Sequence, residues 1–147
     1  PREAERYLSR LSGPLMERID IQIHVPTLQY RDLESQTTEE TSAEIRKRVN
    51  RARAIQKERY SGLSIFCNAM LTGSMVREFC KVDEEGKSVI RAAFDKLKLS
   101  ARAHDRILKV ARTIADLDES PIIKSTHIAE AIQYRSLDRS VMSWKNL

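Results

Sequence analysis

A single strand-like pattern lies near the start of this 147-residue chain, and no second strand pattern accompanies it. From residue 19 to residue 25, isoleucine or valine alternates with a polar residue, and Pro26 ends the run. Alternation with a period of two is typical of a half-buried β-strand. Because a strand must hydrogen-bond to neighbours, the pattern predicts a sheet whose other strands precede residue 1. Without that sheet, we expect the segment to be disordered, to pack on the helices, or to pair with a second copy.

The remainder of the chain has helical periodicity. Only four glycines, four prolines and 5% aromatic residues favour long helices around an aliphatic core. Apolar residues recur three or four positions apart, as on one face of a helix. We predict helices over about 3–11, 42–60 and 68–80, then after the N-caps Asp83 and Ser100, and last from Ser125 or Thr126.

The predicted core is formed by the inward positions of these helices. They are Ile45, Val49, Ala52, Ile55, Leu71, Met75, Val76, Phe79, Val89, Ile90, Ala93, Phe94, Leu97, Ile107, Leu108, Ala111, Ile114, Ala115, Leu117, Ile128, Ala129, Ile132 and Tyr134. We divide the chain into a helix–strand unit over 1–26, a polar linker over 27–41, and a helical domain over 42–147. The tail after residue 135 is expected to dock, if at all, through Trp144.

The net charge of +5 is concentrated in residues 44–59, which contain seven Lys/Arg and two Asp/Glu. Subtracting these from the chain's 26 basic and 21 acidic residues leaves 19 of each elsewhere. Such density suits the backbone of a nucleic acid, and it equally suits a solvated face or the acidic surface of a neighbouring subunit. The candidate contact residues are Arg46, Lys47, Arg48, Arg51, Arg53 and Lys57.

The sequence lacks the motifs of a complete enzyme. It contains no GxxxxGK[ST] phosphate loop, HExxH, CxxC or GxSxG, and its three histidines are too scattered to indicate a metal site. Two cysteines indicate neither a disulfide framework nor a metal site, and no apolar run is long enough to span a membrane. With no signal peptide at the N-terminus, we expect a cytoplasmic protein.

Two long stretches resemble a known family. YLSRLSGPLMERIDIQIHVP resembles the end of the ATPase core in magnesium-chelatase-like AAA+ proteins, and LSARAHDRILKVARTIADLDES followed by HIAEAIQYR resembles the end of the ComM (YifB) competence proteins in that group. Between them, FCNAMLTGSMVREFCKVD is similar to the family's connecting segment. The resemblance covers about residues 6–135.

The resemblance implies a mainly α fold, in which a helical-bundle AAA+ lid domain follows the remnant helix and last strand of an α/β core. It also implies that the intact protein forms a ring, commonly a hexamer, that binds ATP and Mg²⁺ between subunits. The motifs that hold the nucleotide would precede residue 1. This chain alone would then bind no cofactor and be inactive.

Two arginines match functional positions of the family. Arg18, in LMERID, matches the arginine finger, which would reach a neighbouring subunit's nucleotide and stabilise charge on the transferred phosphoryl group. Arg102, in the pattern S-x-R, matches the sensor-two arginine at the start of a lid helix, where anions are favoured. Arg106, one turn later, is the reserve candidate. For Arg18 and Arg102, the alternative is an ordinary surface charge.

The resemblance implies a ring motor acting on DNA, with helicase-like branch migration during natural transformation. Three alternatives stay open. The chain could be a stand-alone helical nucleic-acid-binding module, a part of a magnesium chelatase-type ATPase subunit, or a structural oligomerisation domain.

Overall fold

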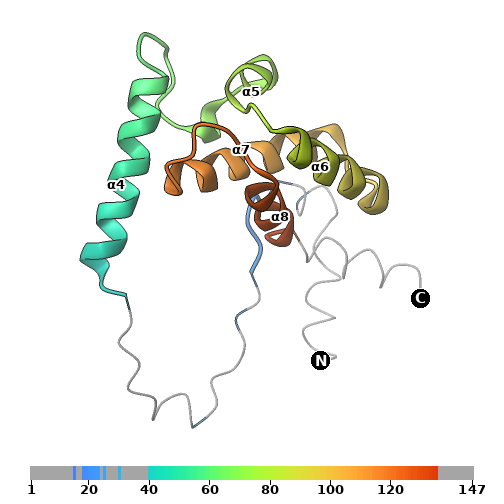
Figure 1. The fold of residues 1–147 in the computed structure, drawn as a ribbon, viewed down its shortest axis with the longest axis horizontal. Helices are drawn as coiled ribbons and strands as arrows, with labels where there is room; N and C mark the ends of the chain where they lie inside the picture. The colour runs from blue at the N-terminus through green and yellow to red at the C-terminus, as the bar shows by residue number, and fades with distance from the viewer. Residues whose placement is uncertain (1–14, 16–17, 24, 26–29, 31–39, 136–147) are drawn as a thin grey trace.

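The computed structural model of the chain describes residues 15, 18–23, 25, 30 and 40–135, and its ordered part is helical. The helices are α4 (Ser42–Arg59), η1 (Asn68–Met70), α5 (Gly73–Phe79), α6 (Glu84–Leu97), α7 (Ala101–Leu117) and α8 (Ser125–Gln133). Helix α7 packs against α4, η1, α5 and α8, and α6 packs against α8. In Figure 1, α4 stands to one side of the group formed by the other helices. The mainly α fold predicted from the sequence is confirmed.

The predicted helix starts are confirmed by capping contacts. Thr41 and Glu44 form a reciprocal capping box at the start of α4. The Asp83 carboxylate accepts from the Gly86 amide at 2.7 Å, and the Ser100 hydroxyl accepts from the Ala103 amide at 3.2 Å. These caps satisfy backbone N–H groups that have no partner inside their own helix.

The core is a single cluster centred on α7. Its members are Tyr60, Leu71, Val76, Cys80, Ile90, Ile107, Leu108, Ala111, Ala115, Ile123, Ile128 and Ala131. Ile123 is tied to the chain before α6, because its amide donates to the Lys81 carbonyl at 2.9 Å and its carbonyl accepts from the Asp83 amide at 3.0 Å. Most predicted core positions on α7 are buried or half-buried there.

Some predicted core positions are wrong. Ala129 is exposed and Ala131 is buried instead, so the inward face of α8 lies two residues further along than expected. Phe94 and Leu117 are also exposed, because they lie at the ends of their helices beyond the reach of the neighbours. On α4, Ile45 and Val49 are exposed, since only the C-terminal half of that helix meets the body.

The strand predicted over 19–25 is absent from the described residues of that segment. Its intended inner face is the exposed one: Val25 is 77% exposed, whereas Gln22 is only 6% exposed. With no described strand beside it, the segment instead makes backbone hydrogen bonds to the helices, and the Gln22 amide donates to the Tyr134 carbonyl at 2.7 Å. This outcome matches the expected packing on the helices. The helix expected over 3–11 and the tail with Trp144 lie outside the described residues.

Candidate functional site

Helix α7 carries three cationic side chains along one face. Arg102, Arg106 and Lys109 are four and three residues apart, a spacing that places them one above another on a helix. They line an open cavity of about 410 Å³ together with the chain from Ala69 to Gly73. The cavity therefore has a cationic wall from α7 and an opposite wall made of the η1–α5 connection.

The cations of this cavity differ in their partners. Arg106 pairs with the Asp20 carboxylate, and its Nη1 also donates to the Arg18 carbonyl at 2.7 Å. The Lys109 ammonium donates to the Ala69 carbonyl at 3.2 Å. Arg102 has no hydrogen-bond or ion-pair partner in the described part of the chain, and it is exposed. Arg102 is thus the cation most accessible to a ligand.

The electrostatics of the cavity suit an anion. Three cationic side chains face two carboxylates, those of Asp20 and Asp105, and the nearby N-terminal turn of α7 adds partial positive charge. A phosphate group, with several oxygens, can bind an arginine through two parallel hydrogen bonds. Among the described residues, no three acidic, histidine or cysteine side chains gather as a metal site would require. The cavity therefore fits phosphate, and the described residues offer no Mg²⁺ site of their own.

The structure brings Arg18 next to this cavity. The segment from Arg18 to Gln22 is fastened at three points: Arg106 donates to the Arg18 carbonyl, Arg135 donates to the Ile19 carbonyl at 3.2 Å, and the Gln22 amide donates to Tyr134. The Arg18 side chain itself is exposed. The two candidate positions identified separately in the sequence, Arg18 and Arg102, therefore lie on either side of Arg106.

The basic helix α4 sorts its six candidate cations by their partners. Arg48 is paired with Glu40, and Arg51 with Glu119 of the turn after α7. Arg53 donates to Gln56 at 3.0 Å. No acidic partner is found within the described ranges for the other three, Arg46, Lys47 and Lys57.

Their positions along α4 divide the six cations further. Arg46, Arg53 and Lys57 are seven and four residues apart and share one face, over about 16 Å of helix. Residues 42–51 are exposed on every side of the helix. This face of α4 is therefore the part of its basic surface that has no acidic partner.

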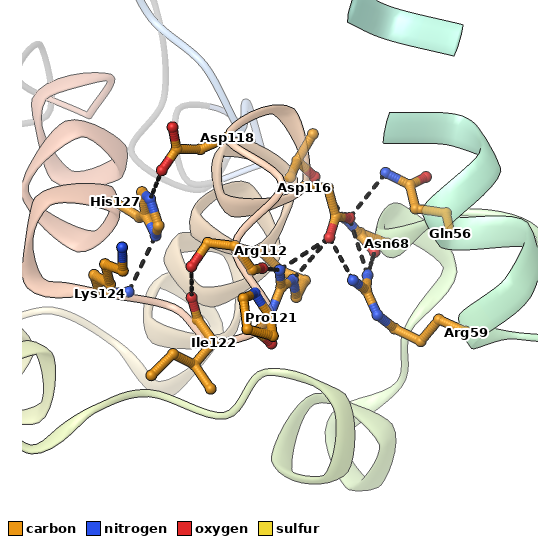
Figure 2. Close-up of polar contacts among 12 residues, drawn as sticks. Gln56, Arg59, Asn68, Arg112, Asp116, Asp118, Pro121, Ile122, Lys124 and His127 are labelled. Atoms are coloured by element: carbon orange, nitrogen blue, oxygen red, sulfur yellow. Dashed lines mark hydrogen bonds and ion pairs between the residues drawn. The ribbon is translucent and has the colours of Figure 1, made fainter. Parts of the chain in front are cut away.

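A buried polar cluster, which the sequence analysis missed, joins α4 to α7. Asp116 accepts two hydrogen bonds from Arg59, at 2.9 and 2.5 Å, and others from Gln56, Asn68 and Arg112 (Figure 2). Arg112 also donates to the carbonyls of residues 120 and 121. The side chain of Asp116 is 0% exposed and that of Arg112 is 1% exposed. The signal that could have revealed the cluster is an Arg and an Asp four residues apart on the inward face of α7.

This cluster shifts the acidity of its carboxyl group. Burial, the largest influence, acts to raise the pKa of Asp116, but hydrogen bonds from Arg59 and Asn68 and the charge of Arg112 outweigh it and lower the pKa. Asp116 is therefore ionised under ordinary conditions and fully hydrogen-bonded. The cluster is a structural joint and contributes no accessible reactive group.

No described helix combines the length and the apolar character that crossing a membrane requires. The known proteins most informative for this chain place it in one family. The family described as magnesium chelatase, subunit ChlI C-terminal, matches residues 39–135, and the family described as magnesium chelatase, subunit ChlI, matches residues 1–33. The chain belongs to the magnesium chelatase ChlI C-terminal family.

Individual relatives agree with this assignment. Competence protein ComM of Haemophilus influenzae is 40% identical over 148 residues, and the protein YifB of Escherichia coli K12 is 40% identical over 149 residues; both alignments cover 100% of this chain. A protein of Mycobacterium tuberculosis is 32% identical over 130 residues. The chain spans about 28% of the length of the first two relatives. The resemblance to ComM-type proteins is confirmed.

Proposed function

We propose that this chain is the lid end of a ComM-like AAA+ ATPase, and that it contributes phosphate-contacting arginines to ATP hydrolysis between subunits of a ring. The observation that carries the proposal is the cavity beside α7, whose cationic wall includes Arg102 and lies next to the segment of Arg18. Family membership and similarity to ComM support it. ATP and Mg²⁺ would be held mainly by parts of the intact protein outside this chain.

In this proposal the two arginines have separate tasks. Arg102 binds a terminal phosphate of ATP at the start of α7, where its charge and the helix dipole act together. Arg18 is exposed and extends to the nucleotide of the adjoining subunit, where a guanidinium offsets charge developing on the transferred phosphoryl group. ATP supplies the phosphoryl group. Arg106 would be the reserve residue for Arg102.

The experiment uses the intact protein that contains this chain. Arg102→Ala is expected to weaken binding of a non-hydrolysable ATP analogue, whereas Arg18→Ala is expected to lower the hydrolysis rate by about 10³-fold or more with little effect on nucleotide affinity. Arg91→Ala, which removes an exposed arginine from α6, is the control. If Arg18→Ala leaves hydrolysis unchanged, a structural oligomerisation role replaces the motor.

The ring and its location are part of the same proposal. Identical subunits would assemble as a hexamer in the cytoplasm, because a finger arginine acts only when a second subunit is present. Sedimentation of the intact protein with and without an ATP analogue measures this assembly. A protein that hydrolyses ATP as a monomer contradicts it. Chelation of the magnesium-chelatase type is the alternative for the whole protein, and metal-insertion assays distinguish it.

A second candidate function is nucleic-acid binding by α4. The observation that favours it is the face formed by Arg46, Arg53 and Lys57, which has no acidic partner among the described residues. Phosphate contacts need cationic charge in reach of a backbone and no base-specific geometry. The similar protein of Haemophilus influenzae is a competence protein, so DNA is the nucleic acid we propose, with branch migration as the activity.

Salt dependence tests this candidate directly. Replacing Arg46, Arg53 and Lys57 by alanine should reduce the slope of log affinity against log salt by about two to three contacts. The matched control replaces Arg48 and Arg51, which are paired with glutamates, and should change the slope less. Equal effects of the two sets would contradict a defined binding face, and no binding at low salt would remove the function.

A further inference from the structure

Arg106 joins two parts of the chain that are far apart in sequence. Its guanidinium donates to the Arg18 carbonyl at 2.7 Å and pairs with the carboxylate of Asp20, residues 88 and 86 positions away. The Arg106 side chain is only 26% exposed. Both contacts point away from the cavity's opening residue, Arg102, and towards the segment that carries Arg18.

These contacts distinguish Arg106 from its neighbour on α7. An arginine already paired with a carboxylate must give up that partner before it can bind another anion, whereas Arg102 has no described partner to lose. The planar fork of a guanidinium also fixes the direction of each group that it binds. Arg106 is therefore better placed to hold a segment in position than to read a phosphate.

The held segment is the one that presents Arg18. Beyond Asp20, it is fastened by the Arg135 side chain on the Ile19 carbonyl and by the Gln22 amide on Tyr134. Those two contacts act after Arg18, and the contact from Arg106 is the printed one that touches Arg18 itself. Without Arg106, the backbone at Arg18 would lose its attachment to α7.

We propose that Arg106 is a positioning residue, which fixes the backbone of Arg18 against α7 so that the Arg18 side chain is presented in one direction. This inference rests on the proposed function, because it assigns the effect of Arg106 to the finger role of Arg18. It replaces the reserve role of Arg106 as a phosphate contact. Because α7 also carries Arg102, movement of this helix and aiming of Arg18 are mechanically linked.

A double-mutant cycle on the intact protein tests the assignment. Arg106→Ala is expected to lower the single-turnover rate of phosphate release by up to about 100-fold, as misplacement of a catalytic group by about 1 Å can do. In an Arg18→Ala background, Arg106→Ala should cause no further loss, because the group that it positions is gone. Arg106→Lys, which keeps a cationic donor, should recover part of the rate.

A second variant and a structural readout separate positioning from misfolding. Asp20→Asn leaves Arg106 and Arg18 in place but weakens the ion pair, so it should lower the rate modestly, and only when Arg18 is present. Hydrogen exchange over residues 18–23 should be faster in Arg106→Ala than in the parent, while exchange in α7 and α8 stays unchanged. Arg91→Ala should change neither measurement.

The results that overturn the inference differ from those that overturn the proposed function. If the losses from Arg18→Ala and Arg106→Ala multiply, or if Arg106→Ala weakens binding of an ATP analogue while Asp20→Asn has no effect, Arg106 contacts phosphate directly. If Arg106→Ala has no effect although Arg18→Ala lowers the rate, the inference alone is wrong. If Arg18→Ala has no effect, the proposed function fails and the inference fails with it.

Discussion

The buried cluster around Asp116 makes a large, specific stability prediction. The change is Asp116→Asn, which keeps the shape of the side chain but removes its charge. In the native structure, the carboxylate accepts hydrogen bonds from four side chains, including both Arg59 and Arg112. Arg59 is 17% exposed and can turn towards water, whereas Arg112 at 1% exposed cannot.

The magnitude follows from the stranded arginine. Removing one partner of a buried ion pair costs about 3–5 kcal/mol, because the other charge stays buried without compensation. Asparagine retains one acceptor oxygen, so the lower end, about 3 kcal/mol, is expected. A small domain unfolds with a free energy of about 5–15 kcal/mol, so the variant should still fold.

Urea denaturation followed by circular dichroism measures this change. With a slope of about 1–3 kcal/mol per molar urea, a loss of 3 kcal/mol lowers the midpoint by about 1–3 M. Asp118→Asn is the matched control, because its carboxylate is mostly exposed and pairs only with His127, and it should cost less than about 1 kcal/mol. If Asp116→Asn costs no more than this control, the reasoning from buried charge is wrong.

Three further predictions follow from individual groups. Because the folded pKa of Asp116 lies below its unfolded value, its contribution to stability is complete above about pH 4 and lost as the pH falls further; acid titration of unfolding should show a shallower loss in Asp116→Asn. Burial raises the pKa of Cys80 to about 11, so at pH 8 a thiol reagent should modify Cys80 far more slowly than Cys67, until urea unfolds the chain and the two rates converge. Gly86→Ala should destabilise the fold by about 1–3 kcal/mol in thermal denaturation, because the added methyl would lie 2.6 Å from a Val82 side-chain carbon; an unchanged midpoint would show that Val82 can move aside.

The helices could be predicted because their determinants are local. Asp83 and Ser100 cap helices within three residues of themselves, and apolar spacing marks the inward face of α7. The exact face is less local: Ala129 and Ala131 lie on the same short helix, and only packing against α6 and α7 decides which one is buried.

The strand expectation failed for a different physical reason. Alternation over 19–25 indicates which backbone could pair, but pairing needs a neighbouring strand that the described residues do not provide. Likewise, the sequence identified Arg18 and Arg102 as separate candidates, yet could not show that Arg106 lies between them. Contacts across 86 to 88 residues depend on how helices pack, which no local pattern records.

The attachment of α4 at one end has a mechanical consequence. Its last turns are held through Gln56 and Arg59 to Asp116, while residues 42–51 extend into solvent (Figure 1). At 1.5 Å per residue, this 18-residue helix is about 27 Å long. A rotation of about 10° at the anchored end would therefore carry Thr41 through about 5 Å. Helix α4 is thus a lever arm, which converts small changes of angle at Asp116 into displacements as large as a helical turn.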